Sequence, residues 1–121
     1  MLVRKLEDCK EFTAGDGAFL RELLHPDKDN LKIRYSFAAA KVLPGQTTKR
    51  HRLQTSEIYY ILKGKGLMRV GEEHAEVSPG CLVYIPPNAD QRISNTSDED
   101  LEFVCIVDPA WKPKDEEIFD E

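Results

Sequence analysis

The sequence predicts a single all-β domain, and three observations support this prediction. With 121 residues, the chain is long enough for one hydrophobic core and too short for two. About seven short segments rich in β-branched and aromatic residues follow one another at intervals of roughly 8–12 residues. Turn residues separate these segments, and no helical pattern alternates with them, so a parallel sheet is not expected. We therefore predict an antiparallel sandwich or barrel.

The predicted strands follow from alternation and from turn residues. The first covers residues 31–40, in which Ile33, Tyr35 and Phe37 share one face. The later strands are expected at residues 57–64, 66–70, 74–77, 81–85, 91–95 and 101–107. Gly71 opens a hairpin turn between two of them. A Pro-Gly pair precedes the CLVYI segment and a double proline follows it, so that strand is short.

The regions outside these strands are less regular. Residues 17–25 carry apolar side chains that fit one face of a helix, but the segment is short and lies between a glycine and Pro26, so its conformation is left open. Residues 109–121 form an acidic tail that we expect to fray. Its Trp111 and Phe119 are the side chains through which it would dock on the barrel or on a second subunit.

Charge and cysteine content exclude several classes of protein. A net charge of −5 and a pI near 5.2 argue against binding to nucleic acid or to anionic membranes. No apolar run is long enough to cross a bilayer, and we expect a cytoplasmic protein. Cys9, Cys81 and Cys105 are odd in number and widely spaced, which favours reduced thiols over disulfides or a thiolate zinc site.

A group of polar residues on one strand face is the first indication of a functional site. His51, Leu53 and Glu57 have the same parity, so an extended chain points them the same way. Glu57 shares its face with Tyr59 in a mostly apolar strand, and a buried carboxylate is costly unless something pairs with it. A metal ion, an arginine such as Arg34 and a hydrogen-bond network are the possible partners.

Two spaced motifs resemble those of the cupin superfamily. Residues 45–64 resemble the first cupin motif, G-x5-H-x-H-x3–4-E-x6-G, at Gly45, His51, Leu53, Glu57 and Gly64. Residues 80–95 resemble the second, G-x5-P-x-G-x2-H-x3-N, at Gly80, Pro86, Asn88, Gln91 and Asn95. The resemblance implies one cupin domain over residues 1–121, a double-stranded β-helix or jelly roll with short terminal extensions. It is strongest for the small single-domain cupins of the sugar-isomerase-like group.

The resemblance also implies a metal site, which this chain matches only in part. In metal-binding cupins two histidines and a glutamate of the first motif and a histidine of the second hold the ion. Those positions are His51, Leu53, Glu57 and Gln91 here, so the expected ligands are His51, Glu57 and Gln91. A mixed nitrogen and oxygen set suits Fe, Mn, Ni, Co or Zn acting as a Lewis acid. Alternatively, the ion is lost, and the cluster binds an organic ligand directly or is structural.

Three functional hypotheses follow. The first is a metal-dependent enzyme of isomerase or dioxygenase type acting on a sugar, sugar phosphate or oxo-acid, with Glu57, His51 and Tyr59 as candidate catalytic residues. Tyr59, Arg34 and Cys105 would contact the small-molecule ligand in the barrel pocket. The second is a non-enzymatic cupin that binds a small molecule without metal, and the third is a structural role with a filled barrel.

We also expect a homodimer. An open β-sandwich leaves strand edges and apolar outer faces that association can cover. The outward-facing Val104 and Ile106, together with the N-terminal MLVRKL segment, are the predicted contact surface.

Overall fold

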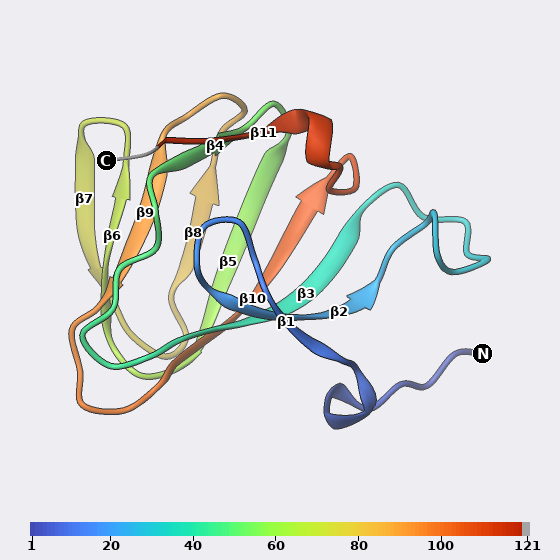
Figure 1. The fold of residues 1–121 in the computed structure, drawn as a ribbon, viewed down its shortest axis with the longest axis horizontal. Helices are drawn as coiled ribbons and strands as arrows, with labels where there is room; N and C mark the ends of the chain where they lie inside the picture. The colour runs from blue at the N-terminus through green and yellow to red at the C-terminus, as the bar shows by residue number, and fades with distance from the viewer. Residues whose placement is uncertain (120–121) are drawn as a thin grey trace.

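The computed structural model describes residues 1–119 as a sandwich of two antiparallel sheets (Figure 1). The six-stranded sheet has the order β1-β2-β3-β10-β5-β8, and the five-stranded sheet has the order β11-β4-β9-β6-β7. The strands are β1 (Glu11–Thr13), β2 (Phe19–Leu24), β3 (Ser36–Val42), β4 (His51–Leu53), β5 (Ser56–Lys63), β6 (Gly66–Val70), β7 (Glu73–Val77), β8 (Leu82–Ile85), β9 (Gln91–Asn95), β10 (Leu101–Asp108) and β11 (Glu116–Ile118). The predicted all-β jelly roll is confirmed.

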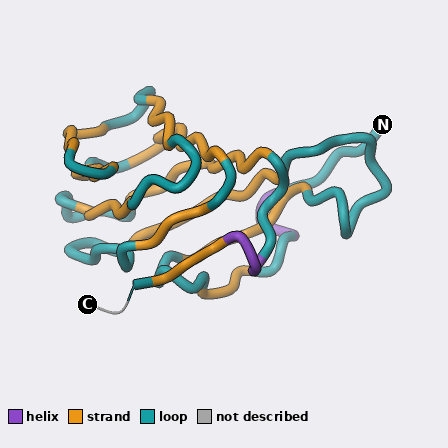
Figure 2. Tube along the Cα trace, turned by 90° about the horizontal axis from the view of Figure 1, so that it is seen from above, coloured by secondary structure: helices purple, strands orange, loops and turns teal. Residues whose placement is uncertain are grey.

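Helical structure is limited, in the described part of the chain, to two short turns. These are the 3-10 helices η1 (Leu6–Asp8) and η2 (Pro113–Asp115), which appear in purple beside the orange strands in Figure 2. No helix among residues 1–119 has the length and apolar character needed to cross a bilayer.

The core lies between the inner faces of the two sheets. Ile61 of β5, Ile93 of β9 and Leu101 of β10 are fully buried there. Tyr59 packs on Phe103 with their ring centroids 4.4 Å apart. Because both sheets contribute to one continuous cluster, the apolar alternation along β5, β9 and β10 is satisfied by contacts between the layers.

The first predicted strand begins later than expected, and its smaller side chains face the core. β3 starts at Ser36, and Ser36, Ala40 and Val42 are its buried residues, whereas Tyr35 is exposed. Phe37 lies opposite Ile106 of β10 on the outer side. The expectation that Ile33, Tyr35 and Phe37 form one face of a strand is therefore wrong. The small alanine side chains of the inner face leave space inside the barrel.

The segment whose conformation was left open is a strand. β2 (Phe19–Leu24) pairs with β3 on one side and β1 on the other. Its helix-like spacing of apolar residues is overridden because β3 offers a row of backbone hydrogen bonds. β2 thereby forms a wall of the barrel beside β3.

The acidic tail is folded over most of its length, so the expectation that it frays is wrong for residues 109–119. η2 leads into β11, which pairs with β4 opposite residues 51–53. The backbone N–H of Phe119 donates to the Arg50 carbonyl at 2.9 Å, and the Arg50 guanidinium lies 4.0 Å from the Phe119 ring centroid. Residues 120–121 lie outside the described residues. The tail therefore completes one edge of the five-stranded sheet.

The glycine that ends the first motif is required by a close approach of two segments. Gly64 has a φ of +83°, and a Cβ added there would lie 2.7 Å from the Asp100 carbonyl oxygen. A side chain at this position would collide with backbone, which cannot move aside easily. Gly64 thus allows the turn after β5 to pack against the start of β10.

Candidate functional site

A cavity of about 320 Å³ lies between the two sheets at the position of the predicted site. The six-stranded sheet contributes Ala40, Glu57, Phe103 and other side chains, and the five-stranded sheet contributes His51, Leu53 and Glu116. The loop before β2 adds Gly15 and Asp16, and Trp111 lines the cavity from the segment after β10. The barrel therefore contains a ligand-sized space rather than a filled interior.

Glu57, Gln91 and Tyr59 form a hydrogen-bonded chain at the cavity wall. The Gln91 side-chain Nε2 donates to Glu57 Oε1 at 3.0 Å, and the Tyr59 hydroxyl donates to Gln91 Oε1 at 2.9 Å. Gln91 is 1% exposed and does not line the cavity, whereas Glu57 and Tyr59 do. Among residues 1–119 no partner lies within hydrogen-bonding distance of Glu57 Oε2. Gln91 thus uses its amide to position the other two side chains.

His51 is held from behind and faces a carboxyl group. Its Nδ1 lies 2.8 Å from the Lys49 carbonyl oxygen, which can only accept, so Nδ1 carries a hydrogen. Its Nε2 lies 3.6 Å from Asp16 Oδ2. Asp16 is fixed in turn, because its Oδ1 accepts from the Ala18 backbone N–H at 3.1 Å. The imidazole therefore presents Nε2 toward Asp16 at the cavity wall.

Asp16 and Glu116 are the site residues that sequence reasoning missed. Asp16 lies between two glycines, a pattern that indicates a turn but not the direction of its side chain. Glu116 pairs with Leu53 in the register of β11 and β4, although its segment has the composition of a solvated tail. Both positions depend on contacts between segments distant in sequence.

Burial and neighbouring carboxyl groups raise the pKa values of Glu57 and Glu116. Burial raises the pKa of Glu57 to about 8, the Gln91 hydrogen bond opposes this rise, and repulsion from Asp16 and Glu116 adds to it. Burial also raises the pKa of Glu116, which Asp16 raises further and which His51 and the Trp111 side chain lower. Glu57 is therefore mainly a neutral carboxylic acid at pH 7 and can donate a hydrogen bond from the cavity wall.

Cys105 and Tyr59 occupy the predicted pocket, and Arg34 does not. Burial raises the pKa of both the Cys105 thiol and the Tyr59 hydroxyl well above their usual values, so both are neutral at pH 7. Cys105 donates to the Ala38 carbonyl at 3.6 Å. Arg34 is absent from the described lining, because its exposed guanidinium is paired with Asp108 at 2.9 Å. The expectation that Arg34 contacts a ligand in this cavity finds no support in its position.

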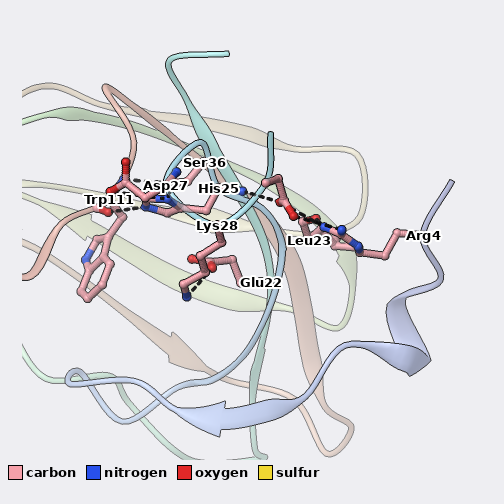
Figure 3. A network of polar contacts seen from close by, with 9 residues as sticks. Arg4, Glu22, Leu23, His25, Asp27, Lys28, Ser36 and Trp111 are labelled. Carbon is pink, nitrogen blue, oxygen red and sulfur yellow. Dashed lines mark hydrogen bonds and ion pairs between the residues drawn. The ribbon is translucent and has the colours of Figure 1, made fainter. Parts of the chain in front are cut away.

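A buried histidine attaches the start of the C-terminal segment beside the cavity (Figure 3). His25 Nδ1 accepts from the Asp27 backbone N–H at 3.1 Å, so Nε2 carries the hydrogen and donates to the Trp111 carbonyl at 2.7 Å. The backbone N–H of Trp111 donates to Ser36 Oγ at 3.0 Å. These contacts place Trp111 at the cavity and lead the chain toward β11.

The residues at the cupin ligand positions do not fit a divalent metal ion. Leu53 has no donor atom, and the Gln91 amide oxygen already accepts from Tyr59. Among residues 1–119 no three His, Cys, Asp or Glu side chains are close enough together to hold an ion. His51 and Glu57 are the two remaining donors of the expected set, and a catalytic metal centre commonly has three protein ligands.

The fold and the site together define a small β-barrel with a ligand-sized cavity at the positions of the two motifs. The Cupin domain family model matches residues 39–107. The protein therefore belongs to the cupin family.

Similar proteins agree with this assignment. The protein MJ1618 of Methanocaldococcus jannaschii is 39% identical, with 94% of this chain and 91% of that protein covered. A glucose-6-phosphate isomerase of Thermococcus onnurineus is 33% identical, with 87% of this chain and 68% of that protein covered. The structure of a predicted oxalate decarboxylase from Thermotoga maritima superposes with a TM-score of 0.78 at 23% identity, covering 89% of this chain and 99% of that one. This last similarity concerns the fold alone.

Proposed function

We propose that the protein binds a small polar molecule directly in the barrel cavity, without a resident metal ion. The observation that carries this proposal is the double engagement of the Gln91 amide, whose nitrogen donates to Glu57 and whose oxygen accepts from Tyr59. A side chain occupied on both ends and set behind the wall is a poor metal ligand. The same arrangement orients Glu57 and Tyr59 toward a ligand.

The cavity offers both polar and apolar contacts to such a ligand. Glu57 Oε2 and the Nε2 side of His51 are polar groups at its wall, while Leu53 and Phe103 supply apolar surface. A few polar groups in a mostly apolar cavity are typical of small-molecule sites. This combination favours a compact organic molecule with at least one polar group.

A second candidate function is proton transfer during sugar isomerisation. It is favoured by the 33% identity to a protein named glucose-6-phosphate isomerase. Interconversion of an aldose and a ketose moves protons between neighbouring atoms, which requires a base and an acid. In this chain His51 Nε2 is the candidate base and the neutral Glu57 carboxyl is the candidate acid.

Elemental analysis combined with mass spectrometry tests the first proposal. Protein purified without a chelating tag is dialysed against Fe, Mn, Ni, Co and Zn salts in turn, and its metal content is measured beside His51→Ala and Gln91→Ala. We expect less than one tenth of an equivalent of any metal, and a co-purifying organic molecule released on denaturation. Near-stoichiometric metal in the parent that is lost in both variants would overturn the proposal and restore a metal-dependent enzyme. Turnover of glucose-6-phosphate that is lost in Glu57→Gln would favour the second candidate.

We also propose that two copies associate through the outer face of the six-stranded sheet. Tyr60, Leu82 and Tyr84 are 43%, 61% and 59% exposed on this face. Tyr60 is the cross-strand neighbour of the half-buried Val104, and Ile106 lies one pair further along the same face. A continuous apolar patch of this kind is more common at an interface than on a free surface. In a two-fold symmetric dimer, this patch on one copy would pack against the same patch on the other copy.

We further propose a reducing, cytoplasmic location. Cys9, Cys81 and Cys105 are all unpaired thiols. Free cysteines in a small β-sandwich are typical of reducing compartments. Measuring the oxidation state of the three thiols in freshly lysed cells would test this location.

A further inference from the structure

We infer that the cavity selects a small organic cation, a protonated amine carried on a compact apolar body, over neutral and anionic molecules of the same shape. This inference rests on the proposed function and adds the charge of the ligand to it. The argument starts from the charges that line the cavity and continues with the unpartnered oxygen of Glu57 and the aromatic wall.

Carboxyl groups outnumber basic groups along the cavity. The acidic residues of the lining are Asp16, Glu22, Glu57 and Glu116. The one lysine of the described lining, Lys28, is paired with Glu22 through an Nζ–Oε1 distance of 2.7 Å, and no arginine of residues 1–119 lines the cavity. An anion would therefore find no free basic side chain, apart from the His51 imidazole that already faces Asp16.

Glu57 supplies an independent indication of a ligand. Its side chain is 7% exposed and lines the cavity, and its Oε1 accepts from Gln91. Its Oε2 has no hydrogen-bond partner within residues 1–119. Among residues 1–119, Thr55 Oγ1 is the fully buried side-chain atom without a partner, so Glu57 Oε2 is open to the cavity. An ammonium group can donate to this oxygen, and its positive charge favours the ionised carboxylate over the neutral acid.

Repulsion among the carboxyl groups points to the same class of ligand. Asp16, Glu57 and Glu116 all line the same cavity, so the three carboxyl groups lie around one ligand-sized space. The other titratable side chains of the lining are Glu22, Lys28, His51, Tyr59 and Cys105. Tyr59 and Cys105 are neutral at pH 7, so neither compensates the acidic charge. A bound cation would relieve this repulsion, whereas an anion would add to it.

The rest of the wall fits the body of such a ligand. The tilted Tyr59–Phe103 pair and the nearby Leu53 provide aromatic and aliphatic surface. An ammonium group is also attracted to the faces of aromatic rings. A volume of about 320 Å³ is at the small end of ligand sites, so the body must be compact.

Binding of three isosteric probes tests the inference. The probes are 2-phenylethylamine, 2-phenylethanol and phenylacetate, which share one body and carry positive, zero and negative charge at pH 7. Calorimetric titration of each into the full chain is expected to give an affinity about tenfold or more higher for the amine than for the alcohol, and no measurable binding of the acid.

Charge-removing variants connect the preference to the carboxyl groups. Asp16→Asn and Glu116→Gln are each expected to reduce the preference for the amine at least threefold, while Glu72→Gln, which removes a charge from an exposed turn, leaves it unchanged. Glu116 lies on an edge strand, so its variant is informative even if Asp16→Asn fails to fold.

The outcomes of these titrations test the preference for a cation separately from the proposed metal-free ligand site. Equal binding of amine and alcohol, or tighter binding of phenylacetate, would overturn the inference while leaving a metal-free ligand site in place. Failure of all three probes to bind would also overturn it. The proposed function itself would fail separately, through the metal analysis described above.

Discussion

The stability of the protein should fall steeply as the pH rises from 5 to 8, because of one buried carboxyl group. Glu57 has an ordinary pKa of 4.5 in the unfolded chain and a pKa of about 8 in the folded protein. Between these values the folded state binds the proton and the unfolded state releases it. Stability from this group is therefore present below pH 4.5 and is lost as the pH rises toward 8.

The size of the effect follows from the two pKa values. Each pH unit within the window costs about 1.4 kcal/mol, so this group lowers the free energy of unfolding by roughly 3–4 kcal/mol between pH 5 and pH 8. Glu57→Gln removes the titrating group but keeps an oxygen that can accept from the Gln91 amide. The variant should match the parent within about 1 kcal/mol at pH 5 and exceed its stability by a few kcal/mol at pH 8.

Urea denaturation at pH 5, 6, 7 and 8 measures this difference. The comparison of the parent with Glu57→Gln isolates Glu57, because Glu116 and the other titrating groups remain in both proteins. Glu72→Gln serves as a control for the loss of one negative charge from an exposed turn. Parallel pH profiles for the parent and Glu57→Gln would refute the reasoning that Glu57 is neutral in the folded protein.

Three further predictions follow from the same structure. Gln91→Leu should lower the free energy of unfolding by about 2–4 kcal/mol, because it leaves the Tyr59 hydroxyl and a buried carboxyl without their partner; an unchanged urea midpoint would contradict the hydrogen-bonded chain. The double variant Leu53→His with Gln91→His should restore the cupin ligand set and bind Mn, Co or Ni near one equivalent, while each single variant binds much less by elemental analysis. Val104→Asp and Ile106→Asp should convert a dimer to a monomer in light scattering after size exclusion, and an unaltered mass would place any interface elsewhere.

The fold could be predicted from the sequence because its signals are local and repeated. Alternation along residues 57–64 and 101–107, with glycine and proline between strands, specifies short antiparallel strands wherever they pair. The two motifs then place His51, Glu57 and Gln91 near one another, and the register of β4 against β9 brings His51 opposite Gln91. Parity places Glu57 and Tyr59 on the inner face, where both line the cavity.

The segment left open and the expectations that were wrong all lie where pairing partners override local pattern. Residues 19–24 have the apolar spacing of a helix but become a strand because β3 provides backbone partners. β3 itself begins at Ser36 rather than at residue 31, and its alanine face is turned inward. The tail from residue 109 has an acidic composition, yet the hydrogen bonds of β11 to β4 fix it.

The local sequence thus determines the class of fold and the residues at the two cupin motifs, since strand alternation and turn chemistry act over a few neighbouring positions. The arrangement of the site depends on segments that are far apart in the chain. Asp16 and Glu116 reach the cavity because the loop before β2 packs beside β11, which in turn pairs with β4. The role of Gln91 also depends on the tertiary structure. The motif places Gln91 at a metal-ligand position, but the fold sets it between Glu57 and Tyr59, where its amide forms hydrogen bonds to both.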